Sequence, residues 1–452
     1  MGRCEREVTP SEIPGKWHNH FPVQEREKSR EQAGRSPVQE KNSETVSFNR
    51  PSSCLTRRWS AAKIDDVTAR GRAEPVEGVY SVKAKVAVLK TSPQSVVEDY
   101  GRLMRMAGYD GVLDRNRDTV IKINVSWHRY FPACSSAPWQ YDGVVTALLA
   151  DGYRRERIIP AHNRTVVVNA RLGIINNHLN TVDYKHGLTP VHLYEPPVHW
   201  EVYRPKGRYR VLDKVYPDGV KIPTLFIGKN IIHLPTVKTH VFTTITGAMK
   251  NAFGGLLSEC RHWTHSVIHE TLVDLLMIQK EIHPGIFAVM DGTVVGDGPG
   301  PRAMIPSVRN YILASADQVA IDSVSARMQG FDPMNLTFIR LAHEDGLGVG
   351  DPRDIEIVGE DISNVNFHHQ QNAQTFASRG QRMIYHGPLK PLEKLLLRSP
   401  IVPWSYVASR IYHDLYWYPF VGHRRVNGIL ATEWGELFRA YDLETYRRKH
   451  RK

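Results

Sequence analysis

The chain has 452 residues, of which 41% are hydrophobic and 23% are charged, so it has the composition of a globular protein with room for two or three domains. Its formal net charge of +12 is compatible with nucleic acids, anionic lipids or small anions as partners. No zinc-finger, RNA-recognition or helix-turn-helix signature is present, and we therefore expect no specific nucleic-acid partner.

The cysteine pattern and the distribution of apolar residues indicate in which cellular compartment the protein is found. The four cysteines are scattered and form no Cys-x-x-Cys pair, which argues against a disulfide framework and against a cysteine-bound zinc or iron–sulfur site. The first residues lack the apolar core of a signal peptide, and no run of about 18 apolar residues occurs. We predict a cytoplasmic protein.

Residues 1–78 are rich in Glu, Arg, Ser, Pro and Gln without apolar periodicity, and we predict a disordered N-terminal segment there. From residue 79, short apolar strands alternate with helical patterns. Strands are predicted at 84–91, 118–128, 157–163, 189–195, 208–223, 229–235 and 354–360, in 285–301 before a Gly/Pro loop, and at the start of 308–330. Helices are predicted at 95–111, 135–153, from 243 or 244 to a stop at the Gly254-Gly255 pair, 264–282, after a turn within 308–330, and at 337–348.

The alternation predicts an α/β domain at residues 79–365, with a mostly parallel or mixed sheet covered by helices. Ser at the cap and Pro138 in the first turn are expected to start the second helix, and Asp317 to cap a later one.

Residues 366–452 form an aromatic-rich, helical C-terminal extension with a basic tail. Its stretch 399–425 is interrupted by Arg410, His413 and Asp414, so a membrane-spanning helix is not expected. Two interpretations stay open: the aromatic side chains pack on the domain's own core, or the segment lies at a lipid surface.

The stretch "HLPTVKTHVFTTITGAMKNAFGGL" (233–256) carries basic residues among apparently interior ones, and no acidic residue occurs between Asp218 and Glu259. Lys238, His240 and Lys250 are expected at a strand exit and along the helix that follows, where α/β folds collect ligands. Free amides at the helix N-terminus would favour an anion there. Further donors are expected from Thr243, Thr244 and Thr246. The alternative is a helix with two solvated lysines and a capping threonine.

A second pattern is "CRHWTHSVIHE" (260–270). His265 and His269 are four residues apart, which on an α-helix is one face, and two such imidazoles can hold a metal with a third ligand. Glu270 follows the second histidine, so the zinc-protease signature is absent. Acid–base or substrate contacts and simple packing remain alternatives.

Three further places carry chemistry-bearing residues. Asp291 is expected at the carboxyl end of a strand, followed by a Gly/Pro loop that contains Asp297 and resembles a phosphate cradle without the Walker lysine. Lys122 and Asn124 lie near another strand end, with Ser135 and Ser136 at a helix start, as a second place for an anion. Free cysteines near these loops, Cys134 and Cys260, are either inert packing groups or redox or nucleophilic groups.

The motifs "LPTVKTHVFTTITGAMKNAFGG", the histidine-rich helix, "DGTVVGDGPGP" and "ILASADQVAIDSVSARMQGFDP" occur in this order, and together the chain resembles the domain of unknown function 362 family over about residues 84–360. The closing "TEWGELFRAY" (432–441) is similar to the tails of relatives. The resemblance implies a fold and a site but no reaction. Many members carry ferredoxin-like cysteine clusters for four-iron–four-sulfur centres; this chain lacks that pattern, so no iron–sulfur cluster is expected.

We therefore predict an enzyme that acts on a small anionic metabolite, a carboxylate or a phosphate, by proton abstraction next to a carbonyl or by group transfer. The alternative is a non-catalytic ligand-binding or redox-partner module. The expected catalytic residues are His240, Lys250 and Asp291, the last orienting a histidine. The expected binding residues are Lys238, Thr243, Thr246, Asn251, Lys122 and Asn124. The cofactor is open: a divalent metal such as nickel is expected, if at all, at His265 and His269.

Overall fold

The computed structural model describes residues 83–165, 167–370, 373–385, 387–392, 407 and 409–450. The chain divides by its contacts into Met1–Pro75 and Val76–Lys452, and all that follows concerns the second unit. The segment 1–78, for which disorder was predicted, lies outside the described residues.

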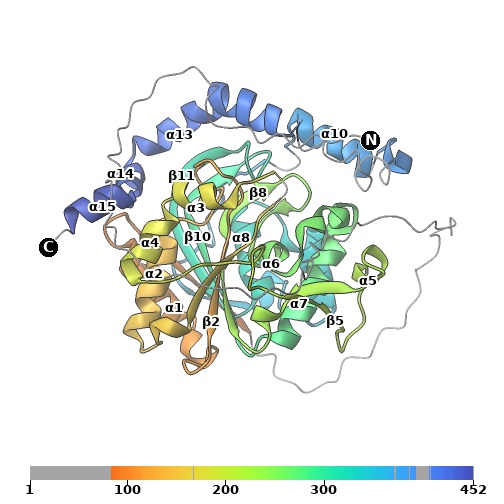
Figure 1. The fold of residues 1–452 in the computed structure, drawn as a ribbon, viewed down its shortest axis with the longest axis horizontal. Helices are drawn as coiled ribbons and strands as arrows, with labels where there is room; N and C mark the ends of the chain where they lie inside the picture. Colours follow the sequence, from red (N-terminus) through yellow and green to blue (C-terminus); the bar gives the residue numbers. More distant parts are fainter. Residues whose placement is uncertain are drawn as a thin grey trace, which may run out of the picture. The chain divides into compact units, whose positions relative to one another are not determined.

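Within the described residues, ten strands form one mixed sheet (Figure 1). Along the sheet the order is β12-β1-β11-β10-β7-β2-β3-β4, and β8 joins at β10 and pairs with β9. The pairs β12–β1, β10–β7, β7–β2, β2–β3 and β3–β4 are parallel, whereas β11 is antiparallel to both β1 and β10. These strands are β1 (Ala84–Lys90), β2 (Thr119–Ile123), β3 (Ile158–His162), β4 (Val191–His192), β7 (Asn230–Leu234), β8 (Thr236–His240), β9 (Thr244–Ile245), β10 (Ile286–Asp297), β11 (Ile305–Ser315) and β12 (Ile355–Gly359). The predicted α/β class with a mixed sheet is confirmed.

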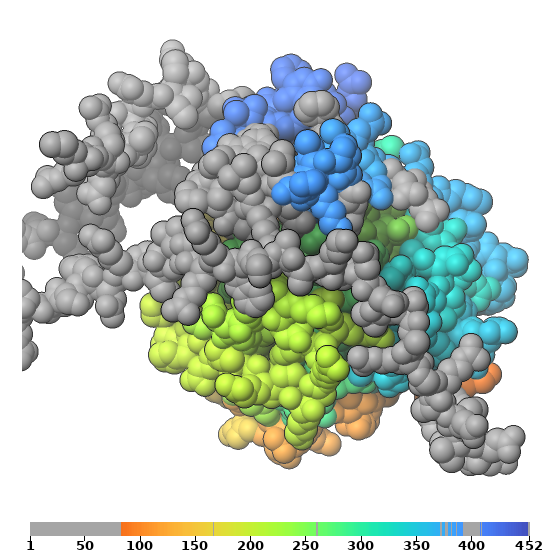
Figure 2. All heavy atoms as spheres, turned by 90° about the vertical axis from the view of Figure 1, so that its right-hand side faces the viewer, coloured from red at the N-terminus to blue at the C-terminus, as the bar shows by residue number. Residues whose placement is uncertain are grey.

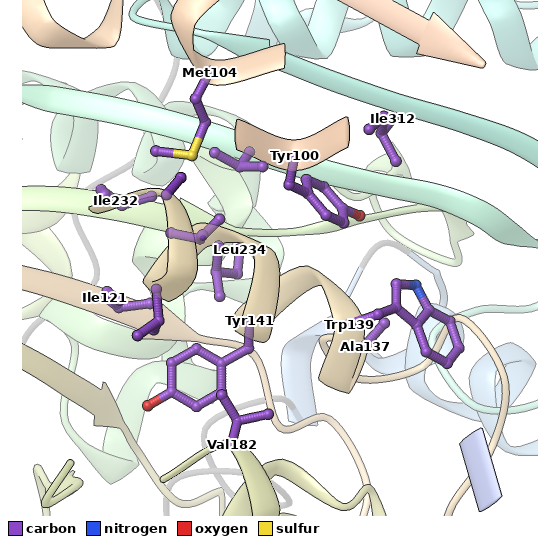
Figure 3. Close-up of a cluster of buried hydrophobic side chains, with 14 of the residues drawn as sticks. Tyr100, Met104, Ile121, Ala137, Trp139, Tyr141, Val182, Ile232, Leu234 and Ile312 are labelled. Carbon is purple, nitrogen blue, oxygen red and sulfur yellow. The ribbon is translucent and has the colours of Figure 1, made fainter. Parts of the chain in front are cut away.

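Helices cover both faces of the sheet, and alternate strand residues face the two layers. On β2, Ile121 and Ile123 enter one core cluster and Val120 enters the other. Figure 3 shows the first cluster, in which Tyr100 and Tyr141 from two covering helices lie near strand residues. The helices of this face are α1 (Val96–Met106), α2 (Pro138–Ala150), α3 (Ala170–Asn176) and α4 (Leu179–His186). The opposite layer contains α6 (Ala248–Leu256), α7 (Ile268–Ile282), α8 (Gln318–Gln329) and α9 (Thr337–Glu344).

Short 3₁₀ turns complete the connections of the domain. They are η1 (Tyr109–Gly111), η2 (Arg155–Arg157), η3 (Thr224–Phe226), η4 (Glu259–Val267), η5 (Pro333–Asn335), η6 (Pro352–Asp354) and η7 (Lys390–Leu392).

The two predicted caps have different outcomes. Asp317 accepts hydrogen bonds from the amides of Val319 and Ala320, so its role as a cap is confirmed. The N-cap of α2 is Ala137 and not a serine, and its amide donates to the side chain of Gln140. The hydroxyl of Ser136 instead donates to the Leu234 carbonyl at 2.7 Å, which ties this loop to the end of β7.

The stretch 189–223 was predicted as two strands, and it is less regular. Only two residues form β4, and the segment 208–223 contains the helix α5 (Leu212–Val215) before the strand β6 (Val220–Pro223). A separate antiparallel ribbon joins β6 to β5 (Trp200–Tyr203). This insertion forms the yellow-green surface of the view in Figure 2.

The long strand β10 changes partner along its length, and this creates the site. Its first residues pair with β7, which ends at Leu234. After Pro235 the chain continues as β8, which pairs with β10 at Asp291 and Gly296. A hollow is thereby left beyond the carboxyl ends of β2 and β7, between β8 and α6.

The C-terminal extension contains α10 (Phe376–Tyr385), η8 (Ile411–Gly422), α13 (His423–Leu430), α14 (Glu433–Ala440) and α15 (Leu443–Lys449). Figure 1 shows α13 to α15 in dark blue beside the β11 and α4 side of the domain. Ile429, Trp434 and Phe438 are buried in the core cluster of α1 and α2, and Trp417 packs on Trp127. Within the described residues, no helix is both long enough and apolar enough to cross a membrane.

Candidate functional site

A cavity of about 330 Å³ lies at the carboxyl ends of β2 and β7. Its walls come from the ends of these strands, from β8 and α6, from η4, from the Gly/Pro loop after β10 and from the C-terminal extension. The charged or ionisable side chains that line it are Lys122, Lys238, His240, Lys250, Arg261, His262, His265, Arg302, Tyr385 and His413. Among the described lining residues there is no aspartate or glutamate.

Strand β8 delivers its basic residues by simple alternation. Thr236, Lys238 and His240 are two residues apart and line the cavity. The residues between them turn away: Val237 is buried in the core against α8, and the Thr239 hydroxyl donates to the Gly298 carbonyl. The local pattern "TVKTH" therefore sets which side chains reach the cavity.

Helix α6 presents one face to the same cavity. Gly254 follows Lys250 by four residues and Asn251 by three, and all three line it, while Met249 and Ala252 on the other face are buried.

The predicted stop of this helix at Gly254-Gly255 is wrong, because α6 runs on to Leu256. A Cβ on Gly255 would lie 3.0 Å from Lys122 Cε and 3.1 Å from the Phe226 ring. A residue without a side chain is therefore favoured at position 255, because the Lys122 side chain passes close to the helix there.

Lys238 is held by oxygen atoms that carry no formal charge. Its Nζ donates to the Cys134 carbonyl at 2.6 Å, to the Ala133 carbonyl at 3.1 Å and to the Thr236 hydroxyl at 2.8 Å. The side chain is 2% exposed. Burial lowers the pKa of Lys238 to about 8, because the ammonium loses its water without gaining a carboxylate.

The pKa values of Lys122 and Lys250 are lowered as well. Lys122 donates to the Ile123 carbonyl at 2.6 Å, and burial together with the charge of Arg261 lowers its pKa to about 7. Lys250 is partly exposed toward the cavity and lies over the Phe253 ring, 4.8 Å from its centre. Burial, Arg261 and Lys238 lower the pKa of Lys250 to about 7. Three lysines thus face one space with their protonated forms disfavoured.

The N-terminus of α6 is already occupied, which corrects the expectation that its amides bind the anion. The Asp322 carboxylate of α8 accepts from the Ala248 amide at 2.6 Å and from the Met249 amide at 3.1 Å. A Cβ on Gly247 would overlap this carboxylate, so glycine is required there. Burial raises the pKa of Asp322 to about 7. The Ala248 and Met249 amides are therefore not free for an anion.

The hydrogen bonds of two of the cavity histidines, His240 and His265, indicate opposite tautomers. His240 Nδ1 accepts from the Phe242 amide at 3.1 Å, so the proton of the neutral ring is on Nε2. His265 Nδ1 lies 2.9 Å from the His262 carbonyl and must donate to it, so its Nε2 carries a lone pair. Burial and the nearby Lys250 lower the pKa of His265 to about 3, and burial, then Lys250, lowers that of His240 well below its usual value.

His265 and His269 do not share a helix face. The segment containing His265 is the 3₁₀ turn η4, and the α-helix begins only at Ile268. His265 lines the cavity, whereas the ring of His269 stacks on Phe338 in the core. Among the described residues, no three His, Cys, Asp or Glu side chains are placed to hold a metal ion together.

Asp291 is separated from the lysines and histidines. It lies in the middle of β10 and not at a strand end, and it is absent from the cavity wall. Its carboxylate accepts from the Tyr100 hydroxyl at 2.8 Å and from Trp139 Nε1 at 3.1 Å. Burial raises the pKa of Asp291 to about 6. It connects β10 to α1 and α2, and it does not orient a cavity histidine.

Not all of the remaining predicted binding residues line the cavity. Asn124, Thr246 and Asn251 line the cavity with Lys122 and Lys238. Thr243 does not, because its buried hydroxyl donates to the Ile245 carbonyl at 2.8 Å.

Comparison with known proteins finds a family match over the middle of the chain. Residues 119–327 match the model of a family described as Domain of unknown function (DUF362). Over this span, which is less than half of the chain, the α/β domain is similar to the DUF362 family. The resemblance noted in the sequence is thereby confirmed. The Thylakoid-associated protein sll1697 of Synechocystis sp. is 29% identical over 126 residues, which are 26% of this chain and 37% of that protein. The match therefore spans little more than a third of that relative, and no solved structure matches the chain.

Two arginines of the DUF362 match complete the cation set and were missed from the sequence. Arg302 follows the Gly/Pro loop directly; its Nε donates to the Ser126 carbonyl at 3.3 Å, and burial lowers its pKa. Arg261 donates to the carbonyls of Leu257 and Arg164. The basic residue at the end of "GDGPGPR" was a usable signal for the first, since the preceding loop follows a strand.

The C-terminal extension, outside the DUF362 match, supplies part of the wall. Tyr385 on α10 donates to the His262 carbonyl at 3.3 Å, and Ser409 and His413 line the cavity beside it. No local pattern links these residues to the lysines, because they lie more than 130 residues further along the chain.

The structure describes the surroundings of one of the two cysteines for which packing and a redox or nucleophilic role were both open. Cys134 is buried, its thiol pKa is raised by burial, and it packs near Trp127 and Phe131. Its environment is typical of a packing cysteine, whereas the side chain of Cys260 lies outside the described residues.

Proposed function

We propose that this protein is an enzyme that binds a small anionic metabolite, a carboxylate or a phosphate, and moves a proton on it. One observation carries the proposal: three lysines and two arginines line one cavity whose described lining contains no carboxylate. Buried cations need a counter-charge or lose their protons. An anionic ligand would supply that counter-charge and restore the lysines to their protonated forms.

The anchoring of each group suggests its role. Lys238 is fixed by three oxygen atoms and is suited to hold the anion in place. Lys250 has a pKa of about 7 and is suited to exchange a proton near neutral pH. His240 offers an Nε2–H donor for a ligand oxygen, since its Nδ1 is already engaged.

His265 offers the complementary group, an Nε2 lone pair that can accept a proton. A donor for a developing oxyanion beside an acceptor for a proton is the arrangement needed to remove a proton next to a carbonyl. The proton would move from the ligand carbon to His265, while the electron pair moves onto the carbonyl oxygen facing His240 and the cations, protonated Lys250 among them.

Isotope exchange separates this enzyme from a module that only binds. We expect the protein to catalyse exchange of protons next to the carbonyl in at least one of a panel of 2-oxo and 3-oxo acids in D₂O, followed by NMR. Lys250→Met is expected to slow that exchange by about 10²-fold or more. Lys221→Met, at an exposed lysine of β6, is the matched control and should exchange at the wild-type rate.

Two results would count against the proposal. Binding of oxo acids and of malonate without any exchange would favour the non-catalytic alternative. Absence of binding for malonate, sulfate and phosphate alike would remove the anion site itself.

A further inference from the structure

The segment η8 in the C-terminal extension has an inward face that the domain covers and an outward face that it does not. Inward, Trp417 is buried against Trp127 and Phe131, and the Tyr418 hydroxyl donates to the Tyr130 carbonyl. This inward face explains how the segment is attached. The first of the two interpretations made from the sequence, packing on the core, is therefore correct for this face.

The outward face is apolar. Large side chains are exposed at every fourth or fifth position, which matches the wide turn of a π-helix. Leu415 is 67% exposed and Phe420 is 70% exposed. The other exposed apolar residues of this stripe are Val407, Ile411 and Tyr416. Isolated exposed apolar residues are normal, but a stripe of five along one segment is typical of an interaction surface.

The charges around the stripe indicate what covers it. Asp414 is the only acidic residue between Glu393 and Glu433. It points inward, where its carboxylate accepts from Trp127 Nε1 at 2.8 Å and lies 3.4 Å from His128 Nε2. Arg410 and Arg424 at the ends of the segment are exposed. The segment thus combines exposed leucine and aromatic side chains with exposed arginines at its two ends, and its acidic residue is turned inward.

We propose that the outward face of η8, together with Val407, docks this protein on an anionic lipid surface. Apolar side chains would enter the boundary between headgroups and acyl chains, and the flanking arginines would meet the lipid phosphates. A protein partner needs no such flanking charge. Since Ser409 and His413 of the same region line the cavity, docking would place the cavity wall at the membrane. The inference is independent of the chemistry proposed for the cavity.

Co-sedimentation of the full chain with vesicles tests this surface. Wild-type protein is expected to bind vesicles of phosphatidylcholine mixed with phosphatidylglycerol, and to bind less to phosphatidylcholine alone or at high salt. Leu415→Ser with Phe420→Ser should reduce the partition coefficient about tenfold or more, because two large apolar side chains leave the interface. Leu172→Ser with Ile175→Ser, at exposed apolar residues of α3, should change nothing.

Two further measurements make the test decisive. Arg410→Glu with Arg424→Glu should abolish the preference for phosphatidylglycerol, and circular dichroism should show every variant folded. The proposal is overturned if folded wild-type protein ignores both kinds of vesicle, or if the Leu415/Phe420 variant sediments like wild type. It is equally overturned if sedimentation velocity shows that this variant dissociates a dimer while lipid binding is absent.

Discussion

Binding of an anion in the cavity should draw protons out of solution. The pKa values of Lys122 and Lys250 are lowered to about 7, and that of Lys238 to about 8, because these ammonium groups are buried near other cations. An anion placed among them reverses that penalty. Each lysine that the anion approaches should therefore recover its proton as the ligand binds.

The size of the uptake follows from these values. At pH 8, a lysine with a pKa of about 7 is about one-tenth protonated, and one with a pKa of about 8 is about half protonated. Full recovery would take up about 0.9 proton at each of Lys122 and Lys250 and about 0.5 at Lys238. Because one small anion does not neutralise all three equally, we expect an uptake of about one to two protons.

Calorimetry measures this uptake directly. Sulfate is a suitable probe, because it does not titrate near pH 8, and the titration is run in Tris and in HEPES, whose ionisation enthalpies differ. The difference between the binding enthalpies observed in the two buffers, divided by the difference between the ionisation enthalpies of the buffers, gives the number of protons taken up. Lys122→Met should reduce that number. Clear binding heats that are identical in both buffers would refute the reasoning, because the lysines would already be charged in the free protein.

Three further predictions concern the surroundings of the cavity. The free energy of unfolding of the ligand-free protein should rise from about pH 7 to 10.5, because Lys122 keeps its proton in the unfolded chain and has lost it in the folded protein. Urea unfolding at several pH values should show that Lys122→Met reduces this rise by up to about 1.4 kcal/mol per pH unit. Gly255→Ala should weaken sulfate binding by displacing Lys122, whereas Gly254→Ala, whose Cβ would meet only Lys122 Nζ at 3.8 Å, should not. Asp322→Ala should lower the free energy of unfolding by about 1–3 kcal/mol, because two amides of α6 lose their acceptor; an unchanged urea midpoint would contradict this assignment.

Most of the strands and helices and part of the candidate site were predictable, because each depends on a pattern within one segment. The end of the predicted strand 229–235 was enough to expect Lys238 and His240 at a strand exit, and the helix that follows added Lys250 and Asn251, although the strand β8 that carries the first two was not predicted. Strand ends of a parallel sheet converge, so Lys122 and Asn124 from β2 were expected at an anion site as well.

The failures have a common physical reason: the deciding partner is remote in sequence. Asp322 caps α6 from a helix that starts about 70 residues later, so the free amides expected at Gly247 are not free. Asp291 accepts a hydrogen bond from Tyr100, which comes about 190 residues earlier in the sequence. His265 and His269 were placed on one face by spacing alone, but a 3₁₀ turn before Ile268 breaks that register.

The lack of acidic residues between Asp218 and Glu259 now has a structural account. Lys122 and Lys238 are oriented by backbone carbonyl groups, and Lys238 also by a hydroxyl. Carbonyl dipoles can fix the position of an ammonium group without cancelling its charge, whereas a carboxylate partner would do both. A carboxylate in this wall would neutralise the cations before any ligand arrived. Positioning by neutral oxygen atoms leaves each lysine able to take up a proton when an anion arrives, and this is the property that the proposed site for a small anion requires.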